Sequence, residues 1–300
     1  MTSTFSKMVI AVLLALAAQI GIGTETAQAQ YFTYVSSSGA DANDCASTAT
    51  PCRNFQRAEN VLSDGGTIVC MNAAYYSAFS ITKSLTIDCR AGGGAFDTQG
   101  IFINAPGKTV RLRNLSVNGL LLSLTEVISI AAADTVELTN VFVAGSVNFG
   151  IKDTRAGPGM LVITDSFVQD NNGPGIVIAP SSGTIAAVLD NVRTTHNSYG
   201  LAVGVGGRVM INRSVFSGNS IGIEADSGAI IAIDGTLVSN SGTGVVGNSN
   251  VTISNSSINS NNTAISGAVR TYGNNRIAAN LSDGTPMIPV GGLSSENGLR

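Results

Sequence analysis

The chain of 300 residues is weakly charged: Asp, Glu, Lys and Arg make up 12% of it, and the formal net charge is −3. It contains 35 glycines and no tryptophan. The weak negative charge and the lack of a basic cluster exclude a nucleic-acid-binding protein. Short runs rich in Val, Ile, Asn and Gly favour strands joined by tight turns over long amphipathic helices.

The first 29 residues have the pattern of an export signal. Lys7 precedes an apolar run from Met8 to Ala18, and Ala27-Gln28-Ala29 is typical of a cleavage site. The run is short for a transmembrane segment, and no second run follows it. We therefore expect residues 1–29 to be removed and the mature protein to be exported, either to the periplasm or out of the cell. An uncleaved membrane anchor is the alternative.

Residues 30–65 are expected to form a loop and a short capping helix. The apolar residues of segment 54–63 share one helical face: Phe55, Ala58, Val61 and Leu62. Such a face could cover the open end of a solenoid, which otherwise exposes apolar core.

The loop before this helix contains Asp41, Asn43 and Asp44, whose oxygen atoms are suitable ligands for Ca²⁺. Turns rich in Asp and Asn are equally common without a metal, because these side chains bond to their own backbone. We therefore expect no cofactor and keep Ca²⁺ as the one candidate.

The four cysteines are Cys45, Cys52, Cys70 and Cys89. An even number in an exported protein predicts two disulfides. Three pairings are possible, and we favour Cys45–Cys52, which closes a short loop. Cys70 and Cys89 each follow an apolar β-run and could bridge neighbouring coils. A zinc site is the competing interpretation, but there is no Cys-x-x-Cys pair and the only histidine is far away in the sequence.

A five-residue pattern of alternating apolar residues, ending in Asn or an equivalent residue, recurs through the rest of the chain. Copies begin at Val110, Val136, Leu161, Ala187, Val209, Ile231 and Val251, at intervals of 20 to 26 residues. This period is typical of solenoid coils and is about half that of a propeller blade. The alternation predicts a strand whose first and third residues are buried and whose second and fourth are exposed.

Two further short strands are expected in each coil, one of them introduced by a Gly-apolar pair such as Gly175-Ile176. The resulting fold class is all-β: a right-handed, single-stranded parallel β-helix with three faces and an N-terminal capping helix. The domain would span residues 66–290, including a C-terminal cap, and would be followed by a disordered tail at 291–300.

Asparagines at equivalent turns are expected to form ladders along the solenoid, because Asn tolerates a left-handed backbone and can bond to the next coil. One ladder is predicted at Asn171, Asn197, Asn219, Asn240 and Asn261. A second is predicted at Asn114, Asn140, Asn191 and Asn255, with Asp165 substituting once. An Asn-lined ligand track is the alternative interpretation.

The beginning of the expected mature chain resembles many bacterial right-handed β-helix repeat proteins. The matching segments are 34–41, 50–55, 66–69, 84–88 and 272–277, and include Gly39 and Asp41 in the first loop and Pro51 before the helix. The resemblance covers nearly all of residues 31–277. It implies the fold of pectin and pectate lyases but no particular reaction, since many members have no assigned activity.

Enzymes with this fold resemble one another in motifs that this chain lacks. Polygalacturonase-like hydrolases share Asn-Thr-Asp, Asp-Asp, Gly-His-Gly and Arg-x-Lys, and mannuronan epimerases share Asp-Pro-His-Glu; none of these occurs. The single histidine of the chain, His196, is expected in an exposed turn. Pectate lyases use Arg or Lys as the base, together with carboxylates that hold Ca²⁺.

The best catalytic candidates are Asp190 and Asp234, with Asn212 on the coil between them and Arg213 beside them. The two carboxylates would lie about 10 Å apart, two strand spacings. That separation is too long to hold one ion but suits the two-carboxylate arrangement of inverting hydrolysis. The alternative interpretation is that they are solvated polar residues on an exposed face.

Two other sets stand out. A polar set comprises Lys152, Asp153, Arg155, Glu224 and Asp226, of which Lys152 and Glu224 share an outward-facing column. An outward-facing apolar strip comprises Val162, Val188, Met210 and Ala232. The strip would lie under a loop or form a contact surface.

The regular coils, the short turns and the missing motifs favour an exported, non-catalytic protein with a surface, matrix or glycan-contacting role. Polysaccharide is then the expected partner, although scattered tyrosines and the lack of tryptophan offer no obvious sugar-stacking platform. The alternative is a polysaccharide lyase or glycoside hydrolase.

Overall fold

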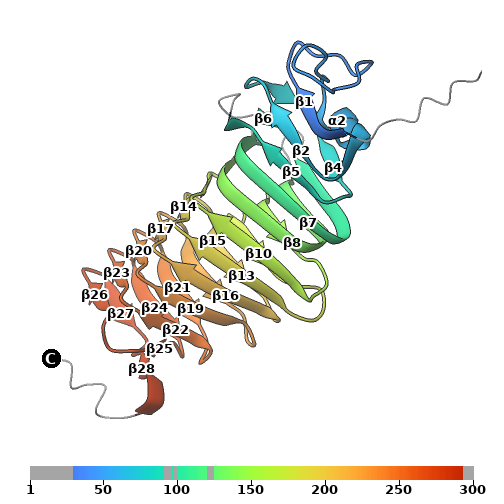
Figure 1. Cartoon of the computed structure of the whole chain (residues 1–300). Coiled ribbons are helices and arrows are strands. Elements are labelled where there is room, and N and C mark those ends of the chain that lie inside the picture. The colour runs from blue at the N-terminus through green and yellow to red at the C-terminus, as the bar shows by residue number, and fades with distance from the viewer. Residues whose placement is uncertain (1–29, 91–95, 98–99, 120–124, 293–300) are drawn as a thin grey trace, which may run out of the picture.

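The computed structural model describes residues 30–90, 96–97, 100–119 and 125–292, and the strands wind into one elongated solenoid whose coils stack in chain order (Figure 1). The expected export signal and most of the expected tail lie outside the described residues. No helix within the described ranges is long and apolar enough to cross a membrane.

Strands pair in parallel with their equivalents in the next coil, and these pairings form three ladders. The first ladder comprises β1 (Gln30–Val35), β2 (Leu62–Cys70), β5 (Leu85–Asp88), β10 (Gly159–Thr164), β13 (Ile185–Asp190), β16 (Gly207–Asn212), β19 (Ile230–Asp234), β22 (Val251–Ser254), β25 (Arg270–Thr271) and β28 (Ile288–Pro289). The second ladder comprises β3 (Tyr75–Tyr76), β6 (Phe96–Asp97), β11 (Phe167–Gln169), β14 (Arg193–Thr195), β17 (Val215–Ser217), β20 (Leu237–Ser239), β23 (Ser257–Asn259) and β26 (Arg276–Ala278). The third ladder comprises β4 (Phe79–Ile81), β9 (Phe149–Asp153), β12 (Ile176–Ile178), β15 (Tyr199–Val203), β18 (Ile221–Ala225), β21 (Thr243–Gly247), β24 (Thr263–Gly267) and β27 (Ser282–Gly284).

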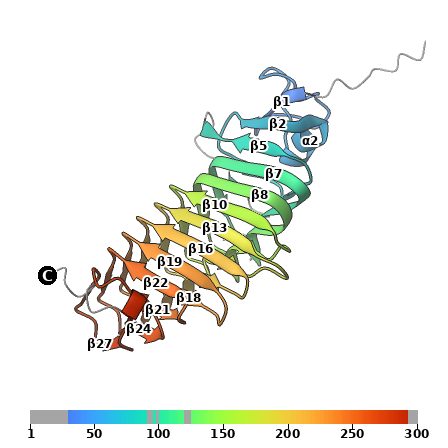
Figure 2. The same cartoon turned by 60° about the horizontal axis from the view of Figure 1, so that its bottom comes forward.

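Two long strands, β7 (Ile101–Asn118) and β8 (Glu126–Ala144), contribute to all three ladders. A short 3-10 helix, η2 (Val290–Gly292), follows β28. Figure 2 shows the first ladder as a continuous sheet from β5 to β22, with no other element lying over it.

The predicted alternation of the repeat is confirmed. In β10 the first and third residues, Leu161 and Ile163, are fully buried, whereas Val162 between them is partly exposed. Leu161 aligns with Ala187 of β13 and then with Val209 of β16, so the buried residues form columns along the axis. The solenoid core is therefore built from stacked aliphatic side chains, one layer per coil.

A sharp corner joins the first ladder to the second, and the residue at each corner has a left-handed backbone. The φ values are 56° at Asn114, 53° at Asn140, 52° at Asp165, 53° at Asn191, 46° at Arg213, 55° at Gly235 and 49° at Asn255. Asn, Asp and Gly adopt this conformation at low cost, which confirms the reason for their recurrence. Arg213 is the departure from the pattern.

The corner between the second and third ladders carries a buried asparagine ladder that differs from the prediction at one position. The backbone N–H of Asn171 donates to Asn197 Oδ1 at 3.2 Å, and that of Asn197 donates to Asn219 Oδ1 at 3.0 Å. In the next coil the ladder residue is Ser241, which donates to Asn261. The prediction of Asn240 was wrong: it lies one residue earlier, at an exposed left-handed position with φ of 52°.

The ladder also continues beyond the predicted set, because the N–H of Asn261 donates to Asn280 Oδ1 at 2.9 Å. The strands β26, β27 and β28 likewise extend all three ladders. The coils thus run on to the end of the described chain.

The N-terminal part contains the helix and both disulfides. Helix α2 (Phe55–Val61) packs on β1, β2 and β4, with Phe55 and Ala58 buried and the Phe55 ring 4.8 Å from that of Phe79. The favoured disulfides are confirmed: Cys45 bonds to Cys52 and Cys70 to Cys89. Because β2 pairs with β5, the second disulfide bridges adjacent coils.

One ion pair lies inside the solenoid wall, where the sequence indicated only a polar set. Asp153 aligns with Ile178, an inward-facing residue of the next coil, and is fully buried. Its carboxylate lies 3.0 Å from the guanidinium of Arg155, which also donates to the carbonyls of Ala133 and Met160. Burial raises the pKa of Asp153 and lowers the pKa of Arg155.

Candidate functional site

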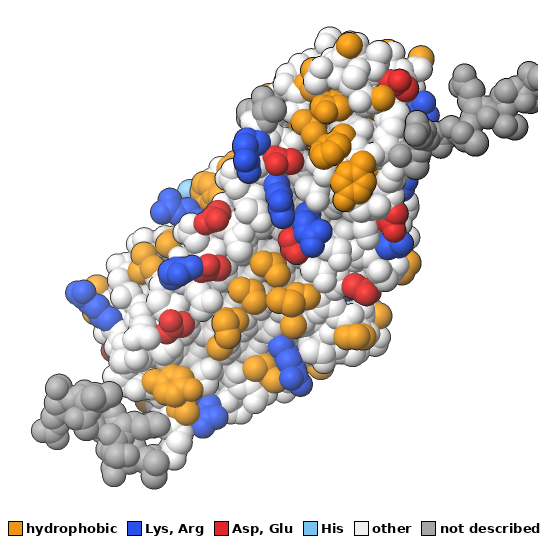
Figure 3. All heavy atoms as spheres, in the orientation of Figure 1, with side chains coloured by type: hydrophobic (Ala, Val, Ile, Leu, Met, Phe, Trp, Pro, Cys, Tyr) orange, Lys and Arg blue, Asp and Glu red, His pale blue; other side chains and the backbone are white. Residues whose placement is uncertain are grey.

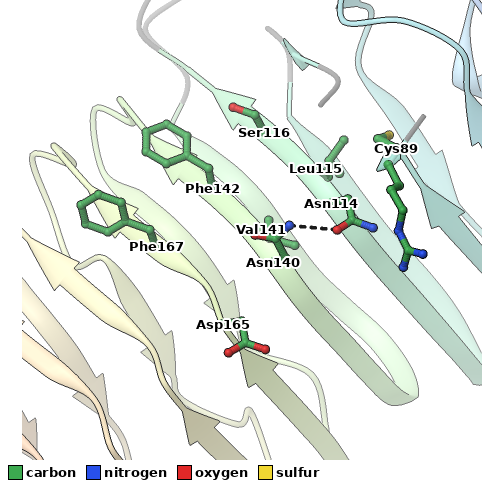
Figure 4. A pocket seen from close by; sticks show the side chains of 10 residues that line it. Cys89, Asn114, Leu115, Ser116, Asn140, Val141, Phe142, Asp165 and Phe167 are labelled. Atoms are coloured by element: carbon green, nitrogen blue, oxygen red, sulfur yellow. Dashed lines mark hydrogen bonds between the residues drawn. The ribbon is translucent and has the colours of Figure 1, made fainter. Parts of the chain in front are cut away.

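A concavity of about 430 Å³ lies on the second ladder, beside the left-handed corner (Figure 4). Its lining comes from successive coils: Cys89, Arg90, Asn114, Leu115, Ser116, Asn140, Val141, Phe142, Asp165 and Phe167. The local sequence explains the shape. After each corner residue the next side chain points inward and the following one points outward, so that Ser116, Phe142 and Phe167 align on the outer surface.

One wall of the concavity is the corner ladder, and this ladder is interrupted. Asn140 Nδ2 donates to Asn114 Oδ1 at 2.8 Å, the bond drawn in Figure 4. Further along, Asn191 Nδ2 donates to Asp165 Oδ1 at 2.7 Å. Asp165 makes no corresponding bond to Asn140, because an ionised carboxylate has no hydrogen to donate to Asn140 Oδ1.

The interruption leaves hydrogen-bond acceptors at the surface. Among the described residues nothing donates to Asn140 Oδ1 or to the second oxygen of Asp165. Both residues are exposed and line the concavity. This wall can therefore accept hydrogen bonds from the hydroxyl groups of a ligand.

The opposite side of the concavity is aromatic. The rings of Phe142 and Phe167 come from neighbouring coils and lie edge to face, with their centroids 5.8 Å apart. Figure 4 shows them side by side, away from the Asn140 and Asp165 wall. Both rings are half-buried, and Arg193 of the next coil lies over Phe167 at 6.0 Å.

Cationic side chains flank the two ends of this surface. Arg90 lines one end, and Arg193 follows Phe167 in the outward column at the other. No carboxylate within the described segments forms an ion pair with either guanidinium. Guanidinium groups donate to hydroxyl, carboxylate and phosphate oxygens alike.

This site was not predicted from the sequence. The signal was present: two residues after each corner residue the chain has Ser116, Phe142, Phe167 and then Arg193. A sugar-stacking platform was sought among tyrosine and tryptophan residues, whereas the structure forms one from Phe142 and Phe167.

The predicted catalytic set lies on the other side of the same corner, on the outer face of the first ladder. Asp190 aligns with Asn212, and Asn212 with Asp234, so the three residues do occupy successive coils. Arg213 forms an ion pair with Asp190, and its side chain is 74% exposed. The structure thus aligns Asp190, Asn212 and Asp234 in successive coils, with Arg213 beside Asp190.

The surroundings of Asp234 favour the ionised form of its carboxyl group. Its Oδ1 accepts hydrogen bonds from Ser254 Oγ at 2.6 Å and from Asn255 Nδ2 at 2.7 Å. These bonds, that of Ser254 first, lower the pKa of the Asp234 carboxyl. Inverting hydrolysis requires one protonated carboxyl group, so Asp190 would have to donate the proton although it is already paired with Arg213.

Other predicted residues stay apart from both surfaces. The His196 side chain is 72% exposed, with its Nδ1 3.5 Å from Asp170 Oδ1. The described residues hold no cluster of three or more His, Cys, Asp or Glu side chains that could bind a metal ion. Asp41 Oδ1 accepts hydrogen bonds from the backbone N–H groups of Arg53 and Asn54, just before α2, so this oxygen is used in a tertiary contact.

No protein-family model and no curated protein matches the chain. Among solved structures, pectate lyase Pel9A is similar with a TM-score of 0.57 and 14% identity, over 87% of this chain and 80% of that one. A rhamnogalacturonan lyase is similar with a TM-score of 0.52 and 12% identity, over 80% and 75%. The chain has the pectate lyase-like parallel β-helix fold. The A-module of a mannuronan C-5 epimerase from Azotobacter vinelandii matches at a TM-score of 0.49 and 17% identity, over 78% and 70%.

At these identities the pectate lyase-like fold says nothing about whether the chain shares a reaction with those proteins.

Proposed function

We propose that this protein is an exported, non-catalytic β-helix that binds a polysaccharide in the concavity beside the left-handed corner. The observation that carries the proposal is the interrupted ladder at Asn140 and Asp165, which faces the Phe142 and Phe167 rings. A sugar ring has hydroxyl donors on its rim and apolar C–H groups on its faces. The concavity offers acceptors for the first and aromatic surface for the second.

Two features support the export and the polymeric ligand. Two disulfides close within the N-terminal coils, and such bonds persist in oxidising compartments. Two structures of the same fold are lyases of pectate and of rhamnogalacturonan. The concavity is open and lies along the solenoid, so a chain longer than the site can extend past both ends.

The finer features of the fold belong to the same proposal. We infer that the coils wind right-handed, since nearly all crossovers between parallel strands do. We also infer that α2 covers the N-terminal end, because the buried Phe55 and Ala58 pack on the first strands.

Binding is tested by affinity electrophoresis of the purified protein through gels that contain acidic or neutral polysaccharides, with and without Ca²⁺. We expect retardation by at least one polysaccharide, independent of Ca²⁺. Phe167→Ala should weaken that binding about tenfold, equivalent to about 1.4 kcal/mol. The matched control is Phe102→Ala, which removes a 42% exposed ring from the third ladder.

Retardation that is equal in the native protein and in Phe167→Ala would remove the concavity as the site. No retardation by any polysaccharide would remove the function itself.

The second candidate function is a polysaccharide lyase or hydrolase that uses Asp190, Asp234 and Arg213. It is favoured only by the alignment of these residues on one exposed face. Release of reducing ends or of unsaturated products would support it, provided that a folded Asp190→Ala, Asp234→Ala double variant lost the activity. Binding without product release would favour the first proposal.

A further inference from the structure

The outer face of the first ladder carries an apolar patch that no described element covers. Hydrophobic side chains gather over β10, β13 and β16 in the middle of the face shown in Figure 3. The central column of the patch is Val162, Val188, Met210 and Ala232, which align in successive coils. We refer to these four residues as the central column.

Large apolar side chains are exposed within and beside the central column. Met210 in the column is 51% exposed, and Met160 and Ile230 beside it are 39% and 41% exposed. Polar residues bound the column at both ends. Glu137, paired with Arg111 at 2.8 Å, adjoins Val162 at one end, and Thr252 followed by Arg270 adjoins Ala232 at the other. The patch is thus limited to four coils.

Charge on this face is divided between its two edges. Along β16, Arg208, Met210 and Asn212 all point outward, so Arg208 and Asn212 lie equally far from the central column on opposite sides. Asp190 and Asp234 flank Asn212 in the adjacent coils. Within the described residues, Arg208 has no ion-pair partner.

We propose that this face packs against the same face of a second copy of the chain, around a two-fold axis that runs along the central column. A two-fold axis in that position exchanges the two edges of the face. It places Arg208 of each copy opposite Asn212 of the other, between Asp190 and Asp234. The apolar residues of the central column then meet their own counterparts.

The arrangement is physically reasonable for a pair of sheets. Parallel and antiparallel sheets pack face to face about 10 Å apart with interdigitated side chains. An isologous contact of this kind closes with two copies and does not propagate into a fibre. Because the patch covers only four coils, the interface belongs to the small class that dissociates readily.

The dimer would also cover the Asp190 and Asp234 edge, and would leave the concavity on the second ladder open. It therefore does not depend on the proposed glycan binding. In this dimer the column of Asp190, Asn212 and Asp234 recognises Arg208 of the second copy and has no catalytic role.

Sedimentation equilibrium of the purified protein tests the proposal at concentrations up to about 100 µM, a range suited to small interfaces. We expect a monomer–dimer equilibrium. Met210→Glu places like charges opposite each other on the axis and should raise the dissociation constant at least about tenfold. The matched control is Leu281→Glu, at an 86% exposed position in the last coils, which should leave the constant unchanged.

A charge exchange tests the geometry directly and guards against misfolded variants. Arg208→Glu and Asp234→Lys should each reduce dimerisation when alone, because each puts like charges in opposition. An equimolar mixture of the two should dimerise again, since one copy now carries the complement of the other. Recovery in the mixture also shows that both variants are folded.

Three results would overturn the proposal. One is a native protein that remains monomeric at the highest concentration. Another is a dimer that Met210→Glu leaves intact, and the third is a mixture that stays monomeric while the native protein dimerises. A monomer whose adsorption to phosphatidylcholine vesicles is lost in Met210→Glu would assign the face to a lipid surface instead.

Discussion

The buried ion pair of Asp153 and Arg155 should make the stability of the solenoid depend on which partner is removed. The two side chains are 0% and 1% exposed. Asp153→Val leaves a buried guanidinium without a counter-charge, and arginine cannot shed its proton at accessible pH. We expect this variant to lose about 3–5 kcal/mol of unfolding free energy, at both acidic and neutral pH.

Arg155→Met leaves a carboxyl group instead, and this group can be neutralised. Burial already raises the pKa of Asp153, and the loss of Arg155 removes the attraction that opposes the rise. A carboxyl group with a raised folded-state pKa stabilises the fold below its unfolded-state pKa, and this contribution is lost as the pH rises through the folded-state value. The variant should therefore come nearest to the native protein in acid and fall behind it towards neutral pH.

Urea unfolding at about pH 4.5 and about pH 7.5 measures both effects. Circular dichroism is the suitable signal, because the chain has no tryptophan. The double variant Asp153→Val, Arg155→Met is the control and should be more stable than Asp153→Val alone. A loss under about 1 kcal/mol for Asp153→Val, or identical pH profiles for the two single variants, would show that the buried charges do not govern the stability of this part of the solenoid.

Two further predictions concern the corners. Asn219→Ala should cost about 2 kcal/mol in urea unfolding, because Asn219 Oδ1 accepts bonds from the buried N–H and Nδ2 of Asn197. Asn240→Gly should cost under about 0.5 kcal/mol, since Asn240 is exposed and left-handed; equal losses would contradict the ladder described here. Arg213→Asn should gain about 1 kcal/mol by relieving a left-handed arginine, more than its exposed ion pair contributes. A lower melting temperature for this variant would show that the ion pair outweighs the backbone.

The fold was accessible from the sequence because its determinants are local and repeated. A strand with one buried face must alternate, and a stacked coil must repeat that alternation at a fixed offset. The burial and the alignment of Leu161, Ala187 and Val209 could therefore be predicted from the repeat. The corner residues could also be predicted from the sequence, because few residue types tolerate a positive φ.

The errors arose where the sequence contains two plausible registers. Ser239-Asn240-Ser241 offers an asparagine next to the true ladder position, and a serine hydroxyl can replace the amide there. The burial of Arg155 could not be predicted from the sequence either. Its guanidinium donates to the carbonyls of Ala133 and Met160, which only the folded chain brings together.

The candidate site divides in the same way. The alignment of Asp190 with Asp234 followed from the period, and the structure reproduces it. The concavity could not be predicted from the period, because it depends on the outward column beyond the corner and on the interruption of the ladder at Asp165. An Asn-to-Asp change within a ladder is conservative in shape, but it removes a donor and so exposes acceptors.

Polysaccharide binding at the interrupted ladder is tested by calorimetric titration of the retarded polysaccharide, or an oligosaccharide of it, into the native protein and into Asp165→Asn. The new amide can donate to Asn140 Oδ1 and still accept from Asn191, which would close the interruption. We expect an affinity about tenfold lower, with a melting temperature equal to or above that of the native protein. An unchanged affinity in the folded variant would show that the interrupted ladder is not the binding wall.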